Sequence, residues 1–390
     1  MPDRQPLRVA FTYISRKQWA GGYNYQLNLF AALARHCPGR IAPVLFAGVH
    51  EASDELVPFS DIPGIDVVVS SAFGRSVGLI DALATGIDRK ASNAFAAKNI
   101  DLVFENARFF GWRLPFPAMA WFPDFQHVRL PQLFSRPARL RRDLGFRVQI
   151  ASGRSILLSS ESALQDYRAS YPGRPNRVFV ARFATEPSAN LLTADASTVL
   201  NQYGLPRKFF YLPNQFWRHK NHQAVIDALT VLKKCGANVV VAASGSAEDP
   251  REPGYFADMM NQVRERGIEE NFRYLGMIPL AHVYALMRVA QALINPSRFE
   301  GWSSTVEEAK SFGVPLILSD IDVHREQAGA AARFFGVDDV NALASQLSEV
   351  WSGSALTVAR DLLPGHEQRV AGFAKDIVNA IERAIERRSA

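Results

Sequence analysis

The chain has 390 residues, of which 48% are hydrophobic and 21% are charged, and its formal net charge is +6. This length predicts roughly two or three domains and excludes a disulfide-held miniprotein or a disordered tail. The two cysteines, Cys37 and Cys235, lie far apart in the sequence, which excludes a zinc ribbon and a disulfide framework and fits a reducing compartment. So modest a charge does not by itself indicate a nucleic-acid partner.

The beginning of the chain lacks the long apolar core and the small-residue cleavage site of a signal peptide. Its apolar runs are of strand length and charged residues interrupt them, so we expect no membrane-spanning segment. We therefore expect a soluble protein of the cytoplasm.

Short apolar segments alternate with amphipathic segments in the first half of the chain. After the first predicted strand comes a loop with Gly21-Gly22, and then a helix over 25–36 with its apolar residues on one face. The strands predicted in this half cover residues 7–14, 65–69, 102–105 and 156–159.

The same alternation is more regular in the second half. Predicted helices begin near Asn221 and cover 255–266, 280–290 and 305–312 between the strands. Strands that alternate with helices in this way predict a doubly wound α/β domain. The predicted strands of this half cover residues 209–212, 239–243, 272–275, 292–295 and 315–319.

A stretch rich in Ser, Thr, Ala and Asn between residues 184 and 207 marks the predicted domain boundary. We expect one Rossmann-like domain over 1–190 and a second over 200–365. The last segment, 366–390, predicts a helix over 366–388 with an apolar side, and the N-terminal domain is a candidate surface for it. That side consists of Val370, Phe373, Ile377, Ile381 and Ile385.

The most informative stretch runs from Asn295 to Ala309, where a strand, a loop with Glu300 and a helix beginning near Ser304 or Thr305 follow one another. Open α/β sheets bind ligands at the carboxyl ends of their strands, and helix N-termini bind anions. The amides of 302–305 therefore suit a phosphate or a sugar oxygen, Glu300 suits sugar hydroxyls, and Glu308 suits a ribose diol. A purely structural alternative is a capping box, which both Ser304-x-x-Glu307 and Thr305-x-x-Glu308 fit.

These residues resemble the motifs of the GT-B glycosyltransferases of family 4, which are retaining enzymes that use nucleotide-sugars. The resemblance implies two doubly wound Rossmann-like domains that face a central cleft, with 1–190 on the acceptor side and 200–365 binding the nucleotide-sugar. It also implies that Glu300 contacts the transferred sugar, that Glu308 contacts the ribose, and that the loop between them binds the donor. Glu307 is one position off the family spacing and receives no role. The matching residues are Pro296-Ser297, Glu300-Gly301-Trp302, Ser303-Ser304-Thr305, Glu308-Ala309 and Gly313 to Ser319.

A second loop, Pro213 to His222, contains the two cations Arg218 and Lys220. Two cations suit a diphosphate, because a helix dipole contributes only about 0.3–1 kcal/mol per anionic contact. By resemblance Lys220 matches the family lysine, whereas Asn214 stands where the family has arginine, so Arg218 is a substitute candidate. A solvated charge is the alternative for Arg218. The loop resembles a bacterial surface-polysaccharide, O-antigen-like branch of the family.

The N-terminal half contains three weaker candidates. Gly21 and Gly22 are compatible with a simple turn, but by resemblance they face the donor phosphates or the acceptor. His127 ends the segment from Trp121, which resembles a family segment near the donor sugar, so His127 is a catalytic candidate beside Glu300 and Lys220. A structural role is the alternative for a lone histidine.

Two further features concern metals and membranes. Asp320-x-Asp322 is similar to the metal-binding pair of GT-A enzymes, but its position resembles a family 4 loop, which implies no metal. The segment Arg136–Arg154 has six arginines, one aspartate and interleaved apolar residues, so it suits either an anionic lipid surface or a solvated face. No recognisable module for nucleic acid is present.

Taken together, the resemblance implies transfer of a sugar from a nucleotide-diphosphate sugar to a carbohydrate or lipid-linked acceptor in polysaccharide assembly. Retention of configuration, no metal and no cofactor are expected, with Lys220, Arg218 and the 302–305 amides stabilising the diphosphate. Two alternatives stay open: a sugar-nucleotide 2-epimerase of the same fold, and a non-catalytic protein that binds a nucleotide-sugar. The missing glycine fingerprint argues against an NAD-linked enzyme.

Overall fold

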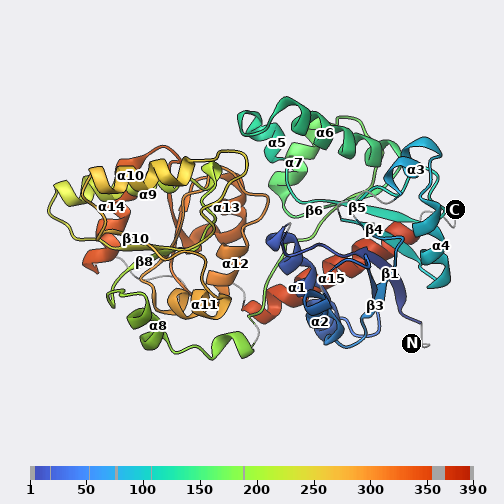
Figure 1. Cartoon of the computed structure of the whole chain (residues 1–390), viewed down its shortest axis with the longest axis horizontal. Coiled ribbons are helices and arrows are strands. Elements are labelled where there is room, and N and C mark those ends of the chain that lie inside the picture. The colour runs from blue at the N-terminus through green and yellow to red at the C-terminus, as the bar shows by residue number, and fades with distance from the viewer. Residues whose placement is uncertain are drawn as a thin grey trace. The chain divides into compact units, whose positions relative to one another are not determined.

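The computed structural model describes residues 5–17, 19–51, 53–74, 78–106, 108–187, 189–353 and 365–386. The chain divides into two compact units. The first unit consists of residues 1–125, 135–184 and 367–390, and the second consists of residues 126–134 and 185–366. Figure 1 shows helices on the faces of a sheet in each unit.

The first unit contains a seven-stranded parallel sheet with the order β3-β2-β1-β4-β5-β6-β7. The four strands predicted here are confirmed, but β2, β5 and β7 were missed. Pro43 lies inside β2, and a proline argues against a strand in sequence-based prediction. The strands are β1 (Leu7–Thr12), β2 (Ile41–Ala47), β3 (Asp66–Val69), β4 (Leu102–Glu105), β5 (Ala118–Phe122), β6 (Ser155–Leu158) and β7 (Val178–Val180).

The C-terminal helix α15 (His366–Ile385) groups with this first unit from Glu367 onward. Its apolar side is buried, and the Phe373 ring lies 5.6 Å from that of Phe183 and 6.0 Å from that of Tyr25. Residues 387 and 388 of the predicted helix lie outside the described residues. The other helices of the unit are α1 (Ala20–His36), α2 (Ser53–Ser60), α3 (Leu79–Ala84), α4 (Arg89–Ala97), α6 (Arg136–Ala151) and α7 (Glu161–Ser170).

The second unit contains a six-stranded parallel sheet with the order β10-β9-β8-β11-β12-β13. The five predicted strands are confirmed, and the sheet gains β13, which pairs with β12 at its edge. This is the doubly wound order of a Rossmann-like domain. The strands are β8 (Phe210–Leu212), β9 (Val241–Ala243), β10 (Phe272–Tyr274), β11 (Leu293–Asn295), β12 (Leu316–Ser319) and β13 (Ala332–Phe335).

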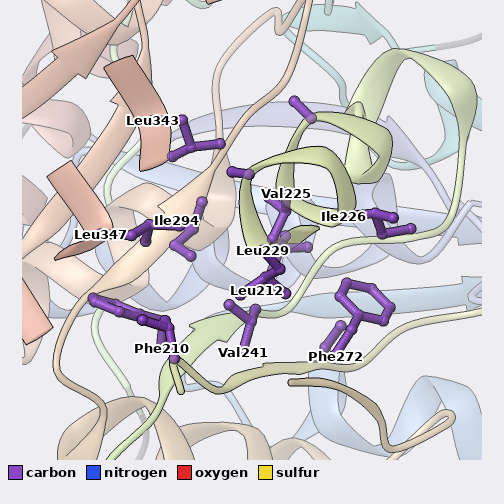
Figure 2. Close-up of a cluster of buried hydrophobic side chains, with 14 of the residues drawn as sticks. Phe210, Leu212, Val225, Ile226, Leu229, Val241, Phe272, Ile294, Leu343 and Leu347 are labelled. Atoms are coloured by element: carbon purple, nitrogen blue, oxygen red, sulfur yellow. The ribbon is translucent and has the colours of Figure 1, made fainter. Parts of the chain in front are cut away.

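Helices cover both faces of this second sheet because successive strand residues point to opposite sides. Phe210 and Leu212 of β8 pack with α9, α10 and α14, as Figure 2 shows for part of that cluster, whereas Phe209 and Tyr211 pack with α8, α11 and α12. The helices of this unit are α5 (Gln126–Arg129), η1 (Pro131–Leu133), η2 (Ala189–Leu192), α8 (Ala196–Gln202), η3 (Arg218–Lys220), α9 (His222–Lys234), α10 (Tyr255–Glu265), α11 (Leu280–Val289), α12 (Ser304–Ser311), α13 (Asp322–Ala328), η4 (Gly329–Ala331) and α14 (Val340–Ser352).

The strand order of the second sheet reverses between β8 and β11, which are neighbours although the chain visits β9 and β10 between them. The loops after these two strands therefore leave the same edge of the sheet in different directions. In open α/β sheets this switch point is where ligands bind. The loop after β8 contains Lys220, and the loop after β11 contains Glu300.

Candidate donor site in the second unit

Lys220 and Glu300 form an ion pair at the switch point. Lys220 Nζ donates to both carboxylate oxygens of Glu300, at 2.7 and 2.9 Å. The two side chains are 15% and 8% exposed, respectively. The two catalytic candidates of these loops are thus brought together although 80 residues separate them in the sequence.

The groups around Glu300 stabilise its charged form. Burial raises the pKa of the Glu300 carboxyl, but the charge and hydrogen bond of Lys220, together with His219 and His324, lower it to about 2. Ser297 Oγ lies 2.7 Å from Glu300 Oε1 and adds a hydrogen bond to the charged form. Glu300 is therefore ionised at neutral pH, so it can accept hydrogen bonds but cannot act as an acid.

Asn214, which stands where the family has arginine, is buried in a network of neutral side chains. Its Nδ2 donates to Asn295 Oδ1 at 3.3 Å, and its Oδ1 accepts from Thr305 Oγ1 at 3.3 Å. Asn295 Oδ1 also lies 2.6 Å from Ser297 Oγ. This network connects the loop after β8 to the start of α12, so Asn214 has a structural role in place of a charge. Sequence reasoning gave Asn295 and Ser297 no role, although both belong to the motif.

The helix α12 begins at Ser304, as predicted, but neither capping box forms. The N-cap residue is Ser303, which makes no side-chain cap hydrogen bond; its Oγ instead accepts from Asn295 Nδ2 at 2.9 Å. The N–H groups of Ser304 and Thr305 have no partner within the helix, because the first turn of any helix leaves them unpaired. The start of α12 is thus available to an anion, next to half-buried Gly301 and Trp302.

Glu307 shows why the capping box is wrong. Its carboxylate accepts from Lys310 Nζ at 2.7 Å and from Gln327 Nε2 at 3.2 Å. Lys310 also donates to the Gln327 carbonyl at 2.7 Å. Glu307 is therefore part of a buried structural pair with Lys310.

Glu308, one residue further along α12, has a different environment. The Tyr284 hydroxyl donates to Glu308 Oε1 at 3.5 Å. Burial raises the pKa of the Glu308 carboxyl to about 7, and the hydrogen bond from Tyr284 offsets only part of this rise. A ligand that donates hydrogen bonds to Glu308 would favour its charged form.

Arg218 lies two residues before Lys220 but is engaged elsewhere. Its side chain is 60% exposed, and its guanidinium donates to both carboxylate oxygens of Glu252 at 3.1 Å. Together with Arg298 it lines a cleft of about 680 Å³, whose lining does not include Lys220 or Glu300. To reach a phosphate beside Lys220, Arg218 would have to leave Glu252.

The prediction that Gly21 and Gly22 lie in a loop before the first helix is wrong. Gly21 and Gly22 lie in the first turn of α1, which begins at Ala20. The ring of the N-cap residue Trp19 covers them, and a Cβ at Gly22 would lie 2.3 Å from a Trp19 ring carbon. Glycine is therefore needed for the close approach of an aromatic ring, a signal that the sequence pattern did not reveal.

His127 lies in the short helix α5 and is buried. It belongs to residues 126–134, which group with the second unit rather than with the neighbouring β5. His324, which the sequence analysis did not select, is also buried. Burial lowers the pKa of His324, and its Nδ1 lies 2.9 Å from the Ser319 carbonyl oxygen, so the ring is neutral.

The Asp320-x-Asp322 segment is not wholly a loop, because Asp322 begins α13. Asp320 pairs with Arg325 at 2.6 and 2.7 Å, which lowers the pKa of Asp320. Asp322 stands in the first turn of the helix, where a negative charge is favourable. Within the described residues no three His, Cys, Asp or Glu side chains gather as a metal site would require.

The arginine-rich segment forms α6, and its arginines have different environments. Arg154, after the helix, is buried and pairs with Glu105 at 3.0 Å, and Arg142 pairs with Asp124 at 2.8 Å. By contrast, Leu140 and Leu144 are 68% and 56% exposed on the helix. The exposed surface of α6 thus combines leucines with arginines, whereas Arg154 belongs to the interior.

Comparison with known proteins supports the resemblance in the second half of the chain. Residues 200–359 match the family model described as glycosyl transferases group 1. A segment of 95 residues is 33% identical to O-antigen chain mannosyltransferase B of Escherichia coli. That match covers 24% of this chain and spans about a quarter of the relative's length. The predicted resemblance is therefore confirmed for this part of the chain.

Solved structures resemble the whole chain. The Anabaena protein HepE, in complex with UDP and glucose, matches with a TM-score of 0.71 and 16% identity, over 97% of this chain and 100% of that one. A lipopolysaccharide outer core galactosyltransferase, WaaB, matches with a TM-score of 0.64 and 16% identity, over 97% and 99%. At these identities the likeness shows the fold, and the predicted GT-B class with two Rossmann-like units is confirmed.

Proposed function

We propose that this protein is a glycosyltransferase that moves a sugar from a nucleotide-diphosphate sugar to a carbohydrate or lipid-linked acceptor in surface-polysaccharide assembly. The observation behind this proposal is the Lys220–Glu300 pair, which lies at the switch point of a doubly wound sheet beside the start of α12. The match to group 1 glycosyl transferases supports it. The polysaccharide context is supported by the O-antigen mannosyltransferase relative.

In this proposal the donor lies across the two loops of the second unit. The diphosphate binds at Lys220 and at the N–H groups of Ser304 and Thr305, since a lysine and a helix N-terminus both favour anions. The ribose diol donates to Glu308, and the sugar hydroxyls donate to Glu300. The UDP present in the HepE structure supports a nucleotide ligand for this fold.

The proposed reaction retains configuration and uses no metal. The bond from the anomeric carbon to the diphosphate oxygen breaks, and its electron pair leaves with the diphosphate, whose growing charge Lys220 and the helix N-terminus stabilise. The acceptor hydroxyl oxygen then bonds to the same face of the sugar, and its proton passes to the departing phosphate oxygen. Glu300, ionised and compensated by Lys220, holds the sugar, and His127 is proposed to position the sugar or the acceptor.

Incubation with nucleotide-sugars tests this proposal directly. Purified protein is given UDP- and GDP-sugars with and without a lipid-linked saccharide acceptor, and NMR of the product reports the anomeric configuration. A glycosylated acceptor with retained configuration is expected. An epimerised or hydrolysed donor that forms without any acceptor would instead support the epimerase alternative, and donor binding without turnover would support a non-catalytic protein.

We also propose that α6 holds the protein on the inner face of the cytoplasmic membrane, near a lipid-linked acceptor. Its exposed Leu140 and Leu144 lie among arginines, and each cation near an anionic lipid surface adds about 1 kcal/mol of attraction. Within the described residues no helix is long and apolar enough to cross a bilayer. The proposal therefore concerns peripheral contact.

Co-sedimentation with vesicles tests this contact. In low salt, vesicles of phosphatidylglycerol should bind the wild type, and the double variant Leu140→Glu, Leu144→Glu should stay in the supernatant. Val57→Glu is the matched control, because Val57 is similarly exposed but lies on α2. Wild-type protein that does not sediment would show that the α6 surface is simply solvated.

A further inference from the structure

The cleft beside Arg218 lies wholly within the second unit and is separate from the proposed donor contacts. Its walls come from η3 and the start of α9, from α10 with the loop before it, and from the loop after β11. At about 680 Å³ it is within the range of about 300–1,000 Å³ that is usual for ligand pockets. Its size therefore suits a small organic ligand.

The charges in the lining of this cleft cancel. Two guanidinium groups, of Arg218 and Arg298, stand with two carboxylates, of Glu252 and Asp258. This balance counts the lining alone: Arg218 pairs with Glu252 inside it, whereas Arg298 pairs at 2.6 Å with Asp338 outside it, so both guanidinium groups are engaged in ion pairs. A lining without net charge does not select an anion, so this cleft differs from the Lys220 site in the ligand that it suits.

Several polar groups in the cleft remain available to a ligand. In the part of the chain that the structure describes, neither the Asp258 carboxylate nor the Tyr255 hydroxyl has a hydrogen-bond partner. The Arg218 guanidinium lies 6.0 Å from the centre of the half-buried Tyr255 ring. Gln262 adds an amide, whose oxygen accepts from Gln223 at 2.9 Å. Carboxylates, amides, guanidinium groups and an aromatic ring are thus present together around a neutral cleft.

A neutral saccharide matches this lining. Each sugar hydroxyl is both a donor and an acceptor, so it pairs with carboxylate oxygens and with guanidinium or amide N–H groups. The C–H surface of a sugar ring packs on an aromatic ring, and Tyr255 contributes one to the lining beside the Arg218 guanidinium. An uncharged ligand has no ionic charge to desolvate, and its hydroxyl groups find hydrogen-bond partners in this lining.

The cleft is joined to the proposed donor site through two short segments. In the first segment Arg218 lines the cleft, and Lys220, two residues later, belongs to the ion pair. In the second segment Arg298 lines the cleft, and Glu300, two residues later, belongs to the ion pair. The Arg298 N–H donates to the His219 carbonyl oxygen at 2.7 Å and fastens the two segments together. A ligand in the cleft would therefore contact the same two segments that form the ion pair.

We propose that this cleft is a second saccharide site that holds part of the glycan chain while a sugar is transferred at Lys220 and Glu300. The assignment of a glycan to it rests on the proposed function, whereas binding of a neutral saccharide rests on the lining alone. The cleft increases the time that a growing chain spends beside the donor site, without taking part in the chemistry.

Saturation-transfer NMR on the full chain tests the proposal, with mannobiose and maltotriose as probes. Both should receive saturation from the wild type, and saturating UDP or GDP should not displace them. Asp258→Asn should weaken saccharide affinity roughly tenfold, because a hydrogen bond to a charged carboxylate becomes one to a neutral amide. Glu265→Gln is the matched control, since it makes the same change at an exposed position on the same helix and should leave affinity unchanged.

Tyr255→Phe provides a second variant that keeps the ring and removes the hydroxyl. Absence of saturation transfer in the wild type, equal effects of the Asp258 and Glu265 variants, or displacement by nucleotide would each overturn the second site. Failure of the proposed function is distinguishable from these results. In that case no nucleotide-sugar is consumed, while saccharide binding that depends on Asp258 persists.

Discussion

Two Lys–Glu pairs in the second unit have the same Nζ–Oε1 distance and different surroundings. The Nζ–Oε1 distance is 2.7 Å both in Lys310–Glu307 and in Lys220–Glu300. The first pair connects residues three apart within α12, and its side chains are 5% and 1% exposed. The second joins two loops at the strand ends, and its side chains remain more exposed.

This comparison shows that the distance between the charged atoms of an ion pair does not indicate its role. Around Glu307 every neighbour described above belongs to the protein interior. Gln327 forms hydrogen bonds with both Lys310 and Glu307. Around Glu300 the neighbours are loop residues at the switch point of the sheet, next to the first turn of α12. We therefore expect loss of the first pair to affect stability and loss of the second to affect transfer.

The largest effect should come from Lys310→Met. This change leaves the Glu307 carboxylate buried without its cation, which costs about 3–5 kcal/mol of unfolding free energy. Urea denaturation measures this loss, with Lys234→Met, at an exposed position, as the control. If the two variants proved equally stable, the interior pair would not have the structural role given to it here.

Glu300→Gln should instead affect transfer more than stability. Transfer should fall by about 10²–10³, comparable to the loss of one group that stabilises the transition state. Unfolding free energy should change less than in Lys310→Met, because the partly exposed Lys220 can be reached by water. Initial rates of transfer and urea denaturation of the same sample give both quantities, and a variant with wild-type rates would remove Glu300 from the site.

A pH experiment extends the comparison to Glu308. Its pKa is about 7 in the folded protein against 4.5 ordinarily, so between these values the folded state keeps a proton that the unfolded state has lost. Unfolding free energy should therefore fall as pH rises from 4.5 to 7. Glu308→Gln should flatten this fall in urea denaturation at several pH values, and an unchanged slope would contradict the raised pKa.

The smallest effect is expected from Ser297→Ala. The change removes one hydrogen bond to Glu300 and one to Asn295, and costs about 1 kcal/mol of unfolding free energy. The pKa of Glu300 should rise, because a hydrogen bond to its charged form is lost. NMR titration of the carboxyl carbon measures this shift, and an unmoved pKa would show that the Ser297 hydrogen bond does not stabilise the charge of Glu300.

The second unit was more predictable from the sequence than the first. Its strands are continuous apolar runs bounded by loops, and the two-glutamate motif identifies the loops that meet. In the first unit β2 contains Pro43, and the start of α1 depends on the ring of Trp19 over Gly22. Such contacts follow from packing rather than from spacing. The same holds for Arg218, whose pairing with Glu252 no local pattern indicates.

A thermal-shift experiment tests the central claim most directly. Wild type and Lys220→Met are heated with UDP, GDP, ADP, CDP and dTDP, each with and without EDTA. One nucleotide at 100 times its dissociation constant should add about 2.7 kcal/mol of stability to the wild type, regardless of EDTA, and much less to the variant. If folded wild-type protein gained stability from no nucleotide, or if both proteins gained equally, the Lys220–Glu300 pair would not be a donor site.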